Sequence, residues 1–130
     1  MAHNEIQITS TSVKISGLRI YARHGVLPQE KTVGNEYVID CELFYDARQA
    51  MESDVIDHAL NYASAVEVIK AEMKESSDLL EHVAGRIARA LDSSFEALDS
   101  GCLTLTKLKP PFPGQLDGVS FTMQWRRRNA

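Results

Sequence analysis

Residues 37–46, YVIDCELFYD, alternate apolar and polar side chains with a period of two. Tyr37, Ile39, Cys41, Leu43 and Tyr45 fall on one side of this pattern, and Asp40, Glu42 and Asp46 fall on the other. Alternation over this length is typical of a β-strand with one buried and one solvated face. We therefore expect a sheet that is covered on one side only.

Three further segments show the same period. Residues 13–21 predict a strand that bends at Gly17, which has no side chain to pack. Residues 102–107 and 119–126 predict two more strands, and the adjacent prolines between them cannot donate ladder hydrogen bonds. The sequence thus predicts four strands.

Between the second and third strands the apolar period changes to three or four residues. Asn61 is a suitable N-cap for one helix, which the polar run 74–77 ends. Asp78 and Glu81 have the spacing of a capping box for a second helix. The expected apolar positions are Tyr62, Val66, Ile69 and Met73 in the first helix, and Leu80, Val83, Ala84, Ile87, Ala88, Leu91 and Phe95 in the second.

The order β-β-α-α-β-β predicts an α+β fold: a four-stranded antiparallel sheet with both helices packed on one face. The polar face of such a sheet either meets solvent or lines a water-filled channel formed by several sheets joined edge to edge. Because uncovered edge strands are templates for pairing, we expect self-association rather than a monomer.

The composition sets limits on the class of protein. The chain has 130 residues, 44% of them hydrophobic, and a net charge of −4, which fits one domain and argues against a nucleic-acid binder. We expect a flexible arm over residues 1–12 and a single domain over 13–127. A polar N-terminus, the lack of a membrane-length apolar run and only two cysteines favour a reduced, cytoplasmic protein with no membrane contact.

Four short blocks resemble the dihydroneopterin aldolase family in identity, order and spacing. They are HGVLPQE at residues 24–30, NYA at 61–63, LLEH at 79–82 and KLKPPFPG at 107–114. The resemblance spans about residues 13–126 and implies the tunnel fold, in which subunits join their sheets into rings and two tetrameric rings stack into an octamer. It also implies a lyase of folate biosynthesis, which cleaves 7,8-dihydroneopterin into 6-hydroxymethyl-7,8-dihydropterin and glycolaldehyde at sites between subunits.

The resemblance assigns roles to five residues. Lys107 is the expected general acid/base, and Tyr62 is expected to contact the pterin and help deliver a proton. Glu81 is expected to bind the 2-amino group and ring N3–H, with a backbone contact from Leu80, while Glu30 is a loop carboxylate at the substrate. The pterin's own C6=N5 bond accepts the cleavage electrons, so the resemblance implies no metal and no cofactor.

Simpler interpretations of the same residues stay open. Lys107 can be a strand-end lysine that extends to water, Glu81 a helix cap and Tyr62 a packing residue. Lys109 is a second lysine beside the expected catalytic one, and we prefer Lys107 because it lies three residues before Pro110, as in the family.

Two other functions compete with the aldolase. An epimerase that inverts the 2′ carbon of dihydroneopterin or its triphosphate could use the same site, because re-addition to the other face of the aldehyde gives epimerisation. A non-catalytic oligomeric pterin-binding module would need Glu81 but not Lys107. Zinc-dependent pteridine enzymes of this architecture are disfavoured, because the four histidines show no metal-ligand spacing.

Overall fold

The four predicted strands pair in chain order into one antiparallel sheet. In the computed structural model, which describes residues 5–128, the strands are β1 (Ser12–Ala22), β2 (Asn35–Tyr45), β3 (Leu98–Lys107) and β4 (Val119–Arg126). The register of β1 against β2 shifts between Ile15 and Leu18, where Gly17 has a φ of 66°. The predicted bend at this glycine is therefore confirmed.

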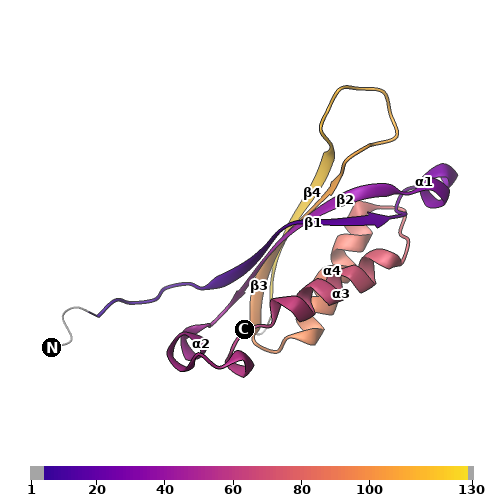
Figure 1. Cartoon of the computed structure of the whole chain (residues 1–130). Helices are drawn as coiled ribbons and strands as arrows, with labels where there is room; N and C mark the ends of the chain where they lie inside the picture. The colour runs from indigo at the N-terminus through magenta and orange to yellow at the C-terminus, as the bar shows by residue number, and fades with distance from the viewer. Residues whose placement is uncertain (1–4, 129–130) are drawn as a thin grey trace.

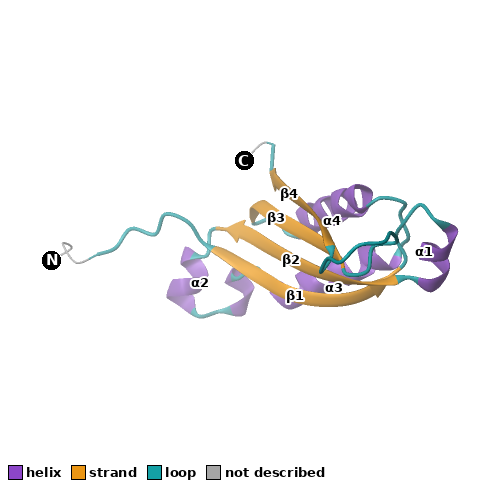
Figure 2. Cartoon of the chain, turned by 90° about the horizontal axis from the view of Figure 1, so that it is seen from above, coloured by secondary structure: helices purple, strands orange, loops and turns teal. Residues whose placement is uncertain are grey.

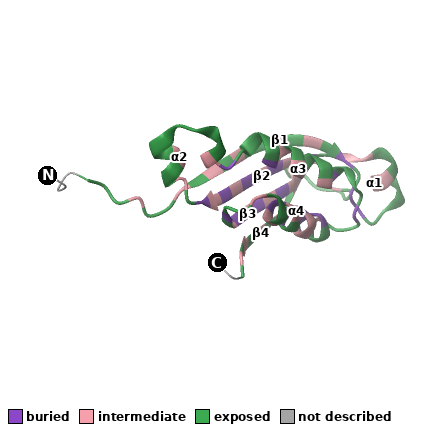
Figure 3. Cartoon of the chain, turned by 90° about the horizontal axis from the view of Figure 1, so that it is seen from below, coloured by how far each residue is buried: buried purple, intermediate pink, exposed green. Residues whose placement is uncertain are grey.

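Two long helices, α3 (Tyr62–Lys74) and α4 (Leu80–Ser94), cover one face of the sheet (Figures 2 and 3). Their buried side chains meet the inward face of β2 and β3, and the core forms between the two layers. The opposite face is polar: Thr104 shares a 2.9 Å hydrogen bond with Thr122, and Thr106 a 2.7 Å bond with Ser120. The predicted α+β arrangement is confirmed.

The starts of the two long helices differ in how far they follow the sequence pattern. Asn61 caps α3 as predicted, because its side chain accepts hydrogen bonds from the amides of Ala63 and Ser64. The predicted capping box of α4 is wrong. The helix has Leu79 at its N-cap without a side-chain hydrogen bond, and Asp78 instead forms a 2.7 Å ion pair with Lys31.

Three short helical segments were not expected: α1 (Pro28–Val33), α2 (Arg48–Ser53) and the 3₁₀ turn η2 (Ile56–His58). α1 and α2 lie at opposite ends of the sheet (Figure 1). α1 follows β1 and therefore lies at the end where β3 finishes, since β1 and β3 run in the same direction. This end is the one that carries the site described below.

Residues 5–11 have no helix or strand and extend away from the sheet (Figure 1). The expected arm covers residues 1–12, of which residues 1–4 lie outside the described part. Its flexibility, and the domain limits at 13 and 127, stay predictions. Within residues 5–128, every helix is too short or too polar to cross a bilayer.

Candidate active site

An ion pair between Lys107 and Glu30 forms the centre of the site. Lys107 ends β3, and its Nζ lies 2.9 Å from Oε1 of Glu30 in the same chain. Both side chains are largely buried, with 12% and 11% of their surface exposed. This burial excludes the simple alternative of a lysine that extends to water. The pair links a strand end to a loop helix 77 residues away in the chain.

The Glu30 carboxylate is held from two sides. Oε2 accepts a 3.0 Å hydrogen bond from the amide of Leu27, at the start of α1. Burial alone would raise the pKa of Glu30, but the hydrogen bonds from Lys107 and the Leu27 amide outweigh it and hold the pKa below its usual value of 4.5. Gly25, with φ of 152°, lies against this carboxylate: a Cβ here would come within 2.3 Å of it.

His24 lies beneath the ion pair and is 1% exposed. Its carbonyl oxygen accepts hydrogen bonds from Lys107 Nζ at 3.2 Å and from the Tyr37 hydroxyl at 3.0 Å. Burial, with smaller effects of nearby cations such as Arg86, lowers the pKa of His24 to about 4. The imidazole is therefore neutral near pH 7.

Ser77 connects this loop to the start of α4. Its amide donates to His24 Nδ1 at 3.1 Å, and its carbonyl oxygen accepts from the amide of Gly25 at 3.0 Å. Its hydroxyl contacts His82 Nδ1 at 2.7 Å and accepts from Arg86 at 3.0 Å. These bonds fix the position of the first turn of α4 relative to the lysine.

Glu81 lies in that first turn and its side chain is exposed. Among residues 5–128, its carboxylate has no hydrogen-bond or ion-pair partner, so the capping role is not taken. Leu80, beside it, is half-buried against the core. Lys107, Glu30, Leu80 and Glu81 thus belong to elements that meet at one end of the sheet.

Tyr62 lies at the other end. It begins α3, whose last residue Lys74 lies about 18 Å further along the helix axis at 1.5 Å per residue. The loop after Lys74 contacts α1, because Ser76 accepts a hydrogen bond from Lys31. Tyr62 is 65% exposed rather than packed in the core, and Ala65 takes the buried position in that turn. One chain therefore does not bring Tyr62 to its own Lys107.

Two residues in the site were missed from the sequence. Tyr37 was assigned only to the buried face of its strand, yet it lies opposite Lys107 in the β2–β3 register. Ser77 was assigned to a polar break between helices. The sequence signal for Tyr37 was that it begins the predicted strand 37–46, where a hydroxyl can reach the loop beyond the strand end.

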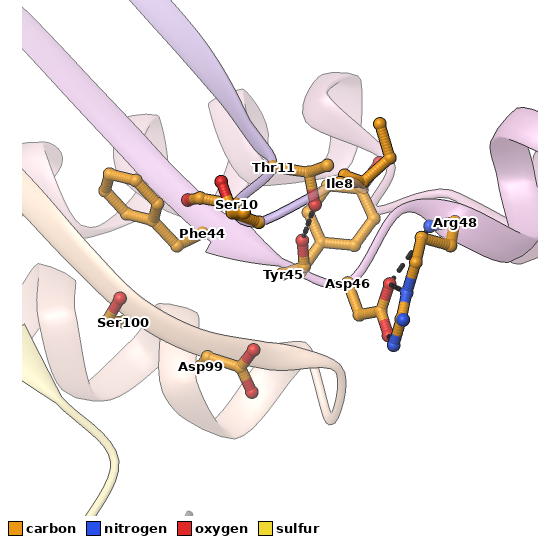
Figure 4. A pocket seen from close by; sticks show the side chains of 10 residues that line it. Ile8, Ser10, Thr11, Phe44, Tyr45, Asp46, Arg48, Asp99 and Ser100 are labelled. Atoms are coloured by element: carbon orange, nitrogen blue, oxygen red, sulfur yellow. Dashed lines mark hydrogen bonds and ion pairs between the residues drawn. The ribbon is translucent and has the colours of Figure 1, made fainter. Parts of the chain in front are cut away.

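A hollow of about 480 Å³ lies at the opposite end of the sheet (Figure 4). It contains none of the predicted site residues, and its one arginine, Arg48, is already paired with Asp46. It is lined by residues 8–11, Phe44, Tyr45, Asp46, Arg48, Asp99 and Ser100. In the described part of the chain, no three His, Cys, Asp or Glu side chains gather so as to hold a metal ion.

Comparison with known proteins identifies the family. Residues 13–124 match the family model described as FolB, dihydroneopterin aldolase. Dihydroneopterin aldolase of Staphylococcus epidermidis is 35% identical over 106 residues, which cover 81% of this chain and 88% of that protein. The matched range 13–124 of the family model includes the four blocks around the site.

Solved structures agree on the fold. The Escherichia coli dihydroneopterin aldolase in complex with neopterin matches with a TM-score of 0.81 and 26% identity over 88% of this chain and 98% of that one. Uricase from Arthrobacter globiformis, at 14% identity, shares only the fold, with a TM-score of 0.64 over 92% of this chain and 50% of that one. The chain has the α+β tunnel fold and belongs to the dihydroneopterin aldolase family, the lyases that act on a pterin in folate biosynthesis.

Proposed function

We propose that this chain cleaves the side chain of 7,8-dihydroneopterin, with Lys107 as the general acid/base. The observation that carries the proposal is the buried pair of Lys107 and Glu30, at 2.9 Å, at the same end of the sheet as the exposed carboxylate of Glu81, which has no partner within residues 5–128. A buried amine near a carboxylate is suited to proton transfer, and an unpaired carboxylate is suited to binding adjacent N–H donors.

The reaction needs one proton removed and one returned. Lys107 in its neutral amine form, directly or through a water, takes the proton of the 2′-hydroxyl, and the bond between C1′ and C2′ breaks as glycolaldehyde forms. The electron pair moves into the C6=N5 system of the ring, and C1′ is then protonated to give 6-hydroxymethyl-7,8-dihydropterin. The balance requires no external oxidant or reductant.

Glu81 binds the other end of the pterin in this proposal. One carboxylate that accepts from the 2-amino group and from N3–H fixes both the position and the orientation of the ring. The backbone of Leu80 adds a contact beside it. The exposure of Glu81 and its lack of an internal partner within residues 5–128 support this role.

Tyr62 comes from a neighbouring copy in this proposal. It is exposed and lies at the end of the sheet remote from Lys107, and the sheet has open edges at β1 and β4 that a second copy can pair with. A ring of copies, expected to be a tetramer that stacks into an octamer, would place the tyrosine of one copy beside the lysine of the next. The cytoplasmic location stays a prediction.

Product analysis tests the cleavage. Purified protein is incubated with 7,8-dihydroneopterin and excess chelator, and the products are identified by mass spectrometry. We expect equal amounts of 6-hydroxymethyl-7,8-dihydropterin and glycolaldehyde. Conversion to dihydromonapterin without glycolaldehyde would instead support the epimerase, and unchanged substrate that stays bound would support the binding module.

A further inference from the structure

Tyr37 is a large, fully buried side chain with a polar group, and it lies directly under the proposed catalytic lysine. Its side chain is 0% exposed, and Tyr37 faces Lys107 across the β2–β3 pair. The lysine Nζ lies 5.9 Å from the centre of the tyrosine ring. A phenylalanine would fill the same space, so packing alone does not explain the hydroxyl.

The hydroxyl and the lysine share one acceptor. The carbonyl oxygen of His24 accepts from the Tyr37 hydroxyl at 3.0 Å and from Lys107 Nζ at 3.2 Å. A carbonyl oxygen has two lone pairs, and both are used here. Because two donors compete for the electron density of one oxygen, each bond is weaker than it would be alone.

Tyr37 also orients the His24 residue itself. The two rings meet edge to face, with centres 5.4 Å apart and planes at 69°. Burial raises the pKa of Tyr37 to about 12, so the hydroxyl remains a donor throughout the working pH range. The Tyr37 side chain thus holds the His24 carbonyl in place and also competes with Lys107 for its oxygen.

We propose that Tyr37 is a positioning residue for the reaction, which holds the His24 carbonyl in place and limits how strongly that carbonyl binds the ammonium of Lys107. Lys107 is thereby held close to Glu30, where the substrate is proposed to bind, and its ammonium can still give up a proton. This inference rests on the proposed function, because it assumes that Lys107 is the acid/base.

Other charged or titratable groups lie around the Lys107 ammonium, and a pH experiment must distinguish their effects from the effect of Tyr37. Glu30 on α1 is its anionic partner, and the His24 imidazole in the loop after β1 is neutral near pH 7. The Tyr37 hydroxyl donates to the His24 carbonyl oxygen rather than to the Glu30 carboxylate or the His24 imidazole. Two further cations act on His24 from α1 and α4, namely Lys31 and Arg86.

Tyr37→Phe tests the proposal, with Tyr45→Phe as the matched control. Tyr45 is also buried, at 6% exposure, but it lies at the far end of the same strand. The readouts are kcat/KM as a function of pH, which reports the free enzyme, and the Kd for neopterin. Thermal unfolding shows that each variant is folded.

In Tyr37→Phe the His24 carbonyl oxygen accepts from the Lys107 ammonium without the competing tyrosine hydroxyl, so that bond becomes stronger. We expect the rising limb of the kcat/KM profile to move up by about 0.5–1 pH unit, and kcat/KM at pH 7 to fall about three- to tenfold, as the strengthening of one hydrogen bond to the ammonium implies. The Kd for neopterin should stay within about twofold, since the variant leaves Glu81 intact. Tyr45→Phe should match wild type in both profile and Kd.

A Tyr37→Phe profile that coincides with wild type would overturn the inference, as would a loss that appears only in Kd. If that variant fails to fold, 3-fluorotyrosine at position 37 keeps the shape and strengthens the donor. It should move the limb to lower pH, and an unmoved limb would overturn the inference. Failure of the proposed function is distinguishable, because wild type and Tyr45→Phe would then also release no glycolaldehyde.

Discussion

Gly25 illustrates how closely the backbone packs against the Glu30 carboxylate. A Cβ at this glycine would lie 2.3 Å from the carboxyl carbon of Glu30, whereas a Cβ at Gly17, also with positive φ, meets nothing within 4 Å. Gly25→Ala should therefore displace Glu30 from Lys107 and lower kcat/KM about 10- to 100-fold, the effect of a lost hydrogen bond between charged groups. Gly17→Ala should cost about 1 kcal/mol of stability from strain and leave kcat/KM unchanged. Equal kcat/KM in the two variants would contradict the account.

His24 makes the stability of the protein sensitive to acid. Its pKa is lowered from 6.5 to about 4 in the folded state, mainly by burial. Above pH 6.5 the His24 imidazole is neutral in both the folded and the unfolded chain, so it does not make stability depend on pH. As the pH falls towards 4, this imidazole gains a proton in the unfolded chain but not in the folded chain. The free energy of unfolding should therefore fall by up to about 3 kcal/mol over this window.

Urea unfolding at a series of pH values measures this loss. His24→Asn keeps an acceptor for the Ser77 amide but has no group that titrates here. Its unfolding free energy should vary less between pH 6.5 and 4 than that of wild type. Parallel curves for the two proteins would show that His24 is not the group responsible.

Among the elements, the starts of α3 and α4 are stabilised in different ways. Asn61 accepts bonds from two helix amides, whereas Asp78 only pairs with Lys31 on the surface. Asn61→Ala should lower the free energy of unfolding by about 1 kcal/mol, and Asp78→Ala should lower it by less, because its ion pair is exposed to solvent. Chemical denaturation measures the loss of stability in both variants. A larger loss in the Asp78 variant would indicate that Asp78 caps α4, contrary to the structure.

Elements with a strong period were predictable, because alternation and helical spacing are local properties. The strands and both long helices follow this rule, and so does the cap at Asn61. The start of α4 was predicted wrongly, because Asp78 forms an ion pair with Lys31, a residue distant in the chain. α1 was expected as a loop, since its six residues are too few to show a period.

The candidate site was predictable only through the resemblance of four short blocks. Composition and spacing alone left Lys107 as an ordinary strand-end lysine, because its partner Glu30 is 77 residues away. The role of the His24 carbonyl was not predictable, since every residue has a backbone carbonyl and the sequence does not show which one accepts both bonds. Tyr37 was missed because its role depends on the bond from its hydroxyl to that carbonyl oxygen.

For the whole molecule, the separation of Tyr62 from Lys107 predicts a site shared between copies. Lys107→Ala and Tyr62→Ala assemblies should each be nearly inactive, and co-expression of the two variants should restore activity. In a mixed ring about one quarter of the interfaces pair an intact lysine with an intact tyrosine, so about one quarter of wild-type activity is expected.

Native mass spectrometry confirms that the two variants share one assembly, and the glycolaldehyde assay measures the activity. Separately assembled variants mixed without exchange of subunits serve as the control and should remain inactive. Mixed assemblies with no more activity than their parents would place both residues in one chain's site or exclude Tyr62 from the reaction.

The most direct test of the account compares Lys107→Ala with Lys109→Ala, two truncations two residues apart. Neopterin binding at equilibrium and glycolaldehyde release in a single turnover are measured on each. We predict that Lys107→Ala releases no glycolaldehyde yet binds neopterin within about tenfold of wild type, while Lys109→Ala keeps near-normal cleavage. Cleavage by Lys107→Ala at the wild-type rate would contradict the assignment of the chemistry to this lysine.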